Sequence, residues 1–221
     1  MDKNEIIKMS AHEMNSPIAV IYGYADLIQC GIIKGEAAEK MAGKIKKEAK
    51  RLSRLVDEMS VYSGIMDGTV YSERVNINVE DMLRHVAEKL REDEKNDFDI
   101  QIFGSGSIYA NKELFKILIT HVIENSIVYN DNDHRKIVCR ISSLEDRLIL
   151  TIDDNGIGIK KEEREKVFEC FYRKNKEYSR RLGGNGMGLA ICQAAARAEN
   201  LKFSISDSGL GGTRITIEKY I

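Results

Sequence analysis

Apolar residues recur every three or four positions through most of the first 64 residues, which is the spacing of helices that pack lengthwise on one another. This repeat predicts one helix over about 3–30 and, after a turn between Gly31 and Gly35, a second over about 36–64. A turn this short makes the pair an antiparallel hairpin. Both stripes are narrow, so we expect two copies of the hairpin to pair as a four-helix bundle. The stripe positions are Ile7, Ala11, Met14, Ile18, Ile21, Ala25 and Ile28, then Met41, Ile45, Glu48, Leu52, Leu55, Met59 and Tyr62.

The rest of the chain has the pattern of an α+β domain. A two-glycine link over 64–72 separates an expected helical domain at 1–66 from an expected second domain at 72–221. In the second domain, strands and helices follow one another in an order that predicts an α/β sandwich, a mixed sheet with helices on one face. The expected strands include Val75 and Ile77 and cover about 98–103, 137–142, 148–153, 201–207 and 213–219; the expected helices cover about 79–93, a segment capped by Asn111, and 187–199.

Composition excludes several classes of protein. The 221 residues are 43% hydrophobic and 31% charged, as in a globular domain rather than a disordered one. A net charge of −1 gives no excess of basic residues that would indicate binding to nucleic acid or to an anionic membrane. The four cysteines have no zinc or disulfide spacing, and no apolar run approaches the ~20 residues of a membrane helix. We therefore expect a cytoplasmic chain that makes no membrane contact itself.

The first helix contains a histidine beside the chain's one proline. Pro17 removes a backbone hydrogen bond at a cost of about 3 kcal/mol, which predicts a bend near His12. His12 lies at the edge of the stripe, Glu13 is adjacent, and Ser16 follows on the same face. The imidazole is thus a reachable nucleophile or base. Taken alone, the pair is also compatible with a surface histidine near an unrelated kink.

Three segments of the second domain carry possible binding chemistry. Asp154-Asn155-Gly156-Ile157-Gly158 follows a buried strand and would let a ligand approach the backbone closely. The segment 183–188 is rich in glycine and leads into a helix, a setting that favours phosphate. Asn125 offers a hard amide oxygen suited to Mg²⁺. The alternatives are a tight turn, a loop without a ligand and a surface asparagine.

The order of these segments resembles the core of a two-component sensor histidine kinase. His-Glu-x-x-x-Pro, a helix asparagine, Asp-x-Gly-x-Gly, Phe168 with Phe171, and Gly-x-Gly-x-Gly follow one another over nearly the whole chain. The resemblance implies that His12 accepts a phosphoryl group and that Glu13 orients or deprotonates its ring. Arg173 would approach the γ-phosphate of ATP.

The resemblance also implies where ATP and Mg²⁺ bind. Asn125 would hold Mg²⁺, Tyr129 would lie against the adenine or ribose, and Asp154 would accept a hydrogen bond from the adenine amino group. Under a lid at about 172–186, the remaining nucleotide contacts would come from Gly156 and Gly158 at the base, Gly184, Gly186 and Gly188 at the phosphates, and Thr213 in a final glycine box.

The implied partners are a second copy, as a homodimer, and the receiver domain of a response regulator. The start at Met1, three residues before the first helix, is typical of a piece cut from a longer, membrane-anchored receptor. His121 and Val128 stand where the family has an asparagine and a basic residue, so autophosphorylation should be slow. Ser16 replaces the usual Thr or Asn, which leaves a phosphatase activity on the receiver open.

Two rival functions remain open. The second domain also resembles the ATPases of gyrase, MutL and the ninety-kilodalton heat-shock chaperone, although His12 in its motif argues against a clamp of that kind. A dimeric relay that binds nucleotide without catalysis is the other. The intact Asn125, Asp154 and glycine boxes argue against it, whereas His121 and Val128 keep it open.

Overall fold

The chain divides into two compact units. A computed structural model describes residues 3–70, 73–92, 97–175, 179 and 184–220. The first unit consists of Met1–Val61 together with Arg173–Asn185. The second consists of Tyr62–Tyr172 and Gly186–Ile221.

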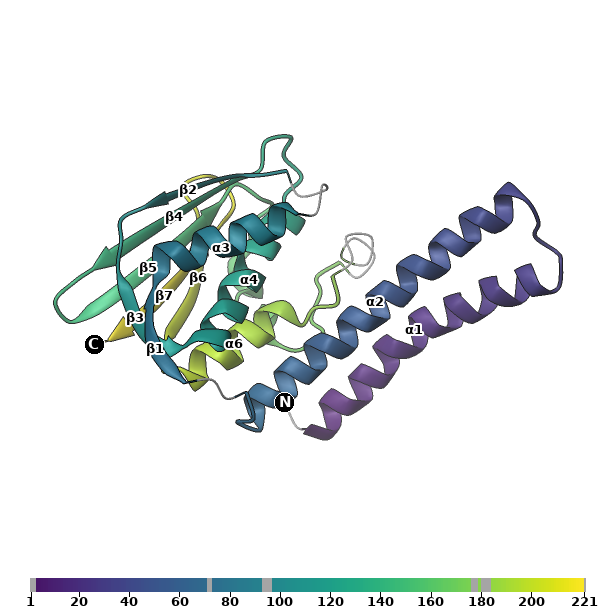
Figure 1. The fold of residues 1–221 in the computed structure, drawn as a ribbon, viewed down its shortest axis with the longest axis horizontal. Helices are drawn as coiled ribbons and strands as arrows, with labels where there is room; N and C mark the ends of the chain where they lie inside the picture. Colours follow the sequence, from purple (N-terminus) through teal and green to yellow (C-terminus); the bar gives the residue numbers. More distant parts are fainter. Residues whose placement is uncertain (1–2, 71–72, 93–96, 176–178, 180–183, 221) are drawn as a thin grey trace. The chain divides into compact units, whose positions relative to one another are not determined.

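Two long helices dominate the first unit, as the sequence predicts. Helix α1 covers Lys3–Gln29 and helix α2 covers Glu36–Met66, and they run antiparallel (Figure 1). Helix α1 continues through Pro17 as a single helical segment. Gly31 and Gly35 have φ of +69° and +58° in the connecting turn, a conformation that side chains with a Cβ rarely adopt.

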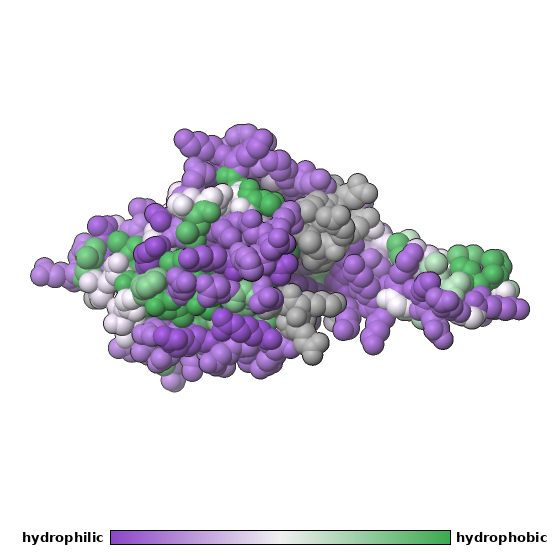
Figure 2. Space-filling view, turned by 90° about the horizontal axis from the view of Figure 1, so that it is seen from above, coloured by the Kyte–Doolittle hydropathy of each residue, from purple (hydrophilic) through white to green (hydrophobic). Residues whose placement is uncertain are grey.

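The predicted stripe of α1 is partly uncovered in a single chain. Ile7 and Ile18 are 58% and 47% exposed, whereas Ser10 and Glu13, each beside a stripe position, are 4% and 7% exposed. The expectation that a second hairpin covers the stripe stays a prediction. Figure 2 shows further apolar surface at the turn end of the hairpin, where Ile32 is 71% exposed.

A five-stranded mixed sheet forms the core of the second unit, with strand order β2-β4-β5-β7-β6. Strand β2 is parallel to β4, and the other neighbours are antiparallel. Three helices cover one face of this sheet, which confirms the predicted fold class (Figure 1). The strands are β2 Asp99–Phe103, β4 Lys136–Ser143, β5 Arg147–Asp154, β6 Lys202–Asp207 and β7 Thr213–Tyr220; the helices are α3 Val79–Arg91, α4 Lys112–Val128 and α6 Gly188–Ala198.

The second unit also contains a two-stranded sheet, of which the sequence predicts one strand. Strand β1 (Arg74–Asn78) pairs antiparallel with β3 (Ser107–Asn111), and the sequence indicated β1 alone. Strand β3 leads directly into α4, because Asn111 ends the strand and its side chain accepts from the backbone N–H groups of Glu113 and Leu114. Short 3₁₀ turns at Lys161–Glu163 and Lys166–Phe168 precede the segment that belongs to the first unit.

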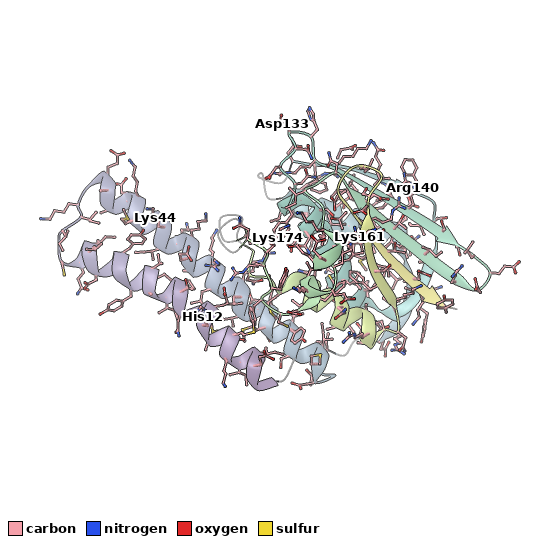
Figure 3. All side chains as sticks on the ribbon, turned by 180° about the vertical axis from the view of Figure 1, so that it is seen from behind. His12, Lys44, Asp133, Arg140, Lys161 and Lys174 are labelled. Atoms are coloured by element: carbon pink, nitrogen blue, oxygen red, sulfur yellow. The ribbon has the colours of Figure 1, made fainter. Side chains whose placement is uncertain are left out.

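The other face of the large sheet carries a buried carboxylate that is paired with two partly exposed arginines. Asp153 is 1% exposed and lies 2.8 Å from Nε of Arg214 and 3.1 Å from Nη1 of Arg140. Figure 3 shows Arg140 on the sheet. Two guanidinium groups thus compensate one buried carboxylate across three neighbouring strands. Within the described residues, no helix is long and apolar enough to span a bilayer.

A substitution at Gly104 tests how closely the loop after β2 packs. It has φ of +80°, and a Cβ there would lie 2.0 Å from the carbonyl oxygen of Ile141. We expect Gly104→Ala to lower the free energy of unfolding by about 2 kcal/mol or more, measured by urea denaturation. Gly209→Ala is the matched control, because a Cβ at Gly209 has no neighbour within 4 Å. Equal stabilities of the two variants would contradict the described loop.

Candidate functional site

Asp154 lies at the end of β5 and collects hydrogen bonds from three parts of the second unit. Its Oδ1 accepts from the backbone N–H of Gly156 at 2.9 Å and of Thr213 at 3.0 Å. Its Oδ2 accepts from the Ser126 hydroxyl of α4 at 3.2 Å. Burial raises the pKa of Asp154, and the three donors oppose that rise by stabilising the carboxylate. Oδ2, with a single donor, retains capacity to accept one more hydrogen bond.

Glycines allow the chain to close around this carboxylate. A Cβ at Gly212 would lie 2.2 Å from Oδ1 of Asp154, and a Cβ at Gly156 would lie 2.5 Å from the carbonyl oxygen of Tyr129. Gly158 has φ of +70° and faces Gly212. The structure shows a packing role for the glycines at 156 and 158 beside Asp154, and their predicted role in lining a ligand pocket stays a prediction.

Tyr129, at the end of α4, helps to hold the same loop. Its carbonyl accepts from the N–H of Ile157 at 3.1 Å. Next to it, the side chain of Asn130 donates to Oδ1 of Asn155 at 2.8 Å, and the N–H of Lys136 donates to the same oxygen. The sequence did not predict the roles of Ser126, Asn130 and Asn155 in holding this loop. Asn155 lies inside the predicted Asp154–Gly158 motif, but its partners, like that of Ser126, are 19 to 28 positions away and give no local pattern.

Asn125 and His121, both on α4, lie next to the first residue of α6, Gly188. A Cβ at Gly188 would lie 3.6 Å from Nδ2 of Asn125 and 3.6 Å from Nδ1 of His121. The N-cap residue of α6, Met187, makes no side-chain capping hydrogen bond. The amide of Asn125 therefore adjoins the N-terminal end of a helix, where the dipole favours an anion and the amide oxygen could ligate a cation bound to it.

The two ends of the predicted lid segment are joined. The N–H of Phe171 donates to the carbonyl of Gly186 at 2.9 Å, with φ of 65° at Phe171 and 83° at Gly186. The ring of Phe168 packs edge-on against Phe203 at 5.8 Å between centroids. Seven of the fifteen residues of the predicted lid at 172–186, namely 176–178 and 180–183, lie outside the described residues.

The first unit holds the remaining predicted residues. His12 is exposed on α1 (Figure 3), and Ser16 is half-buried one turn later. Glu13 is buried, and its Oε2 lies 2.5 Å from Nη2 of Arg173 and 3.6 Å from Nη2 of Arg51. Glu13 therefore contacts two arginines, whereas the prediction placed it on the imidazole of His12.

The predicted residues thus gather in two groups, each within one unit. His12, Glu13 and Ser16 of α1 share the first unit with Arg173 and Gly184, and Nη1 of Arg173 donates to the carbonyl of Gly184 at 3.4 Å. The second unit contains the rest: Asn125, Tyr129, Asp154, Gly156, Gly158, Gly186, Gly188 and Thr213. Their roles as ligand contacts stay predictions.

Two family models match the chain, one on each predicted domain. Residues 110–220 match the family described as histidine kinase-, DNA gyrase B- and HSP90-like ATPases. Residues 2–68 match the His kinase A (phospho-acceptor) domain.

Individual proteins agree with these matches. The histidine protein kinase SaeS of Staphylococcus aureus is 27% identical over 98% of this chain, which spans 63% of the length of that protein. The histidine kinase AdeS of Acinetobacter baumannii superposes with a TM-score of 0.76 at 20% identity, covering 95% of this chain and 97% of that one. ThkA, solved in complex with the response regulator TrrA, superposes with a TM-score of 0.75 at 20% identity, covering 98% of this chain and 61% of that one.

The chain belongs to the family of histidine kinase-, DNA gyrase B- and HSP90-like ATPases, whose model matches half of its length. The phospho-acceptor domain before it gives the chain both domains of a two-component sensor histidine kinase core. The resemblance inferred from the motifs is confirmed.

Replacing Asp154 by Asn separates stability from ligand recognition. The pKa of Asp154 is raised on folding, so its contribution to stability is greatest below the unfolded pKa and is lost as pH rises through the folded pKa. We therefore expect Asp154→Asn to unfold at pH 7 at no lower urea concentration than the wild type. ATP affinity by calorimetry should fall about 10- to 100-fold, because an amide donor would face the adenine amino group. Unchanged affinity would remove Asp154 from the site.

In the wild type, the same carboxyl predicts a pH dependence of binding. Because the pKa of Asp154 is raised, the carboxylate is protonated at a higher pH than a free aspartate would be. We expect ATP affinity to weaken as pH falls toward this raised pKa, and the Asp154→Asn variant to lack that part of the dependence. Calorimetric titrations over a series of pH values check this expectation.

Proposed function

We propose that the chain is an ATP-dependent protein-histidine kinase that phosphorylates His12 and passes the phosphoryl group to an aspartate of a response regulator. The observation that carries the proposal is an exposed histidine in a matched phospho-acceptor hairpin, followed by a matched ATPase domain with a buried carboxylate. By the resemblance inferred from the sequence, gyrase-like and chaperone-like ATPases share the ATPase domain with this chain but not the phospho-acceptor hairpin.

The residues of the second unit fit a nucleotide with a divalent cation. Oδ2 of Asp154 has room for the adenine amino group as a donor. The start of α6 at Gly188 suits a phosphate, and the adjoining amide of Asn125 suits Mg²⁺. When bound, Mg²⁺ neutralises charge on the phosphate oxygens. In this proposal Gly156, Gly158 and Thr213 hold the base end, Tyr129 flanks it, and Gly186 flanks the phosphate end. Gly184, which belongs to the first unit, stays a predicted phosphate contact.

The reaction forms one bond and breaks one. A ring nitrogen of neutral His12 attacks the γ-phosphorus of ATP, the bond to the β–γ bridging oxygen breaks, and ADP leaves. The ring becomes positively charged, and Glu13 stabilises that charge or takes the proton from the other nitrogen. Arg173 would neutralise the γ-phosphate. A carboxylate of the receiver domain then accepts the phosphoryl group from the His12 nitrogen.

The uncovered stripe of α1 supports a homodimer. Ile7 and Ile18 are about half exposed in one chain, and a second hairpin would cover them in a four-helix bundle. The structure of ThkA was solved with a response regulator, which supports a receiver domain as the second partner here. Ser16, one turn after His12, could also position water for a receiver phosphatase activity.

The test of the proposal is phosphorylation with γ-labelled ATP and Mg²⁺. We expect an acid-labile, alkali-stable label on the wild type and none on His12→Gln, because the acceptor nitrogen is lost. His85→Gln, which changes another exposed histidine, should keep the label. ATP binding without any label on the wild type would instead favour a nucleotide-binding relay.

His121 and Val128 stand where the family has an asparagine and a basic residue, and these differences predict slow phosphorylation. His121 adjoins Asn125 at the start of α6, where the family has an amide side chain. We expect His121→Asn to raise the initial rate of labelling about 2- to 10-fold, the worth of one hydrogen bond. Val128→Lys, which supplies the missing charge, should act in the same direction. Unchanged rates in both variants would show that phosphate contacts do not limit the reaction.

A further inference from the structure

Glu13 of α1 and Arg173 form an ion pair between two segments of the first unit. It is the shortest such pair among the described side chains of that unit. Nη2 of Arg173 lies 2.5 Å from Oε2 of Glu13, and the two side chains are 1% and 9% exposed. Arg51 of α2 approaches the same oxygen at 3.6 Å. It also approaches Glu48 at 3.4 Å, so it shares its charge between two carboxylates. Little solvent screens these charges.

The pair is held by charge and lacks aligned hydrogen bonds. Among the described residues, neither Oε2 of Glu13 nor Nε and Nη2 of Arg173 has a hydrogen-bond partner. Nη1 of Arg173 donates to the carbonyl of Gly184 at 3.4 Å. A buried guanidinium with unused donors is costly, and a planar fork of donors matches the oxygens of a phosphate. Arg173 is thus suited to exchange Glu13 for an anion with several acceptor oxygens.

We propose that Glu13 and the γ-phosphate of ATP are alternative partners of Arg173, so that Glu13 sets the affinity for the nucleoside triphosphate. The inference rests on the proposed function, in which Arg173 acts on the γ-phosphate and Glu13 on the ring of His12. Neither group can take that role while it is paired with the other. When Arg173 leaves, Arg51 still compensates the charge of Glu13.

The competition has a measurable size. A ligand that needs a free Arg173 binds with its intrinsic affinity reduced by the fraction of molecules in which Arg173 is free. A pair formed in about nine molecules of ten weakens binding about tenfold. ADP lacks the γ-phosphate and escapes this penalty, so Glu13 narrows the preference for ATP over ADP.

The test is calorimetric titration of Glu13→Gln with a non-hydrolysable ATP analogue and, separately, with ADP. We expect the analogue to bind about tenfold more tightly than to the wild type, and ADP to bind equally. Glu58→Gln is the matched control, because Glu58 is also 7% exposed and paired with an arginine, Arg54, in the same hairpin. It removes the same charge and should leave both affinities unchanged.

A double-mutant cycle with Arg173→Gln assigns the effect to the pair. In that background, Glu13→Gln should no longer change the affinity for the analogue. If Glu13→Gln fails to fold, Glu13→Asp keeps the charge, shortens the reach and should give a smaller gain in the same direction. An unchanged or weaker affinity in the folded variant, or an equal gain in Glu58→Gln, would overturn the inference. Wild-type protein that binds neither nucleotide would overturn the proposed function as well.

Discussion

The buried carboxylate of Asp154 is the group around which three segments of the second unit are arranged. It joins the end of β5, helix α4 and the start of β7 through Gly156, Ser126 and Thr213. A carboxylate in this position is tolerated because three donors compensate the loss of water. The glycine positions around it follow from that requirement, since any Cβ at Gly212 would collide with Oδ1. The same group that organises the loops keeps one acceptor position for a ligand.

Glu13 is also a buried carboxylate, but charged partners compensate it. Asp154 is held by uncharged donors in fixed geometry, whereas Glu13 is held by two guanidinium groups. Hydrogen bonds from the backbone cannot leave without unfolding the loop, but a long arginine side chain can move to another anion. The first arrangement suits a fixed recognition group, and the second suits a group that changes partners during a reaction.

Much of the fold was predictable because strong periodicity and turn residues act locally. The two long helices and the five strands of the mixed sheet were located to within about three residues. Strand β3 escaped prediction because Ser107–Asn111 is short and runs directly into the cap of α4. The burial of Ser10 and Glu13 on α1 was not predicted, because both are polar and a repeat of apolar residues gives no signal for them.

The domain order, the motif residues and their assignment to a kinase-like core can be inferred from the amino-acid sequence, because these depend on residue identity and short spacing. Which groups meet is visible only in the folded chain. Ser126 lies 28 positions before Asp154, and Arg173 lies 160 positions after Glu13. Such pairs carry no periodic signal, since contacts over long separations are set by how whole elements pack. Whether an acid is free, hydrogen-bonded or ion-paired is therefore a property of the folded chain.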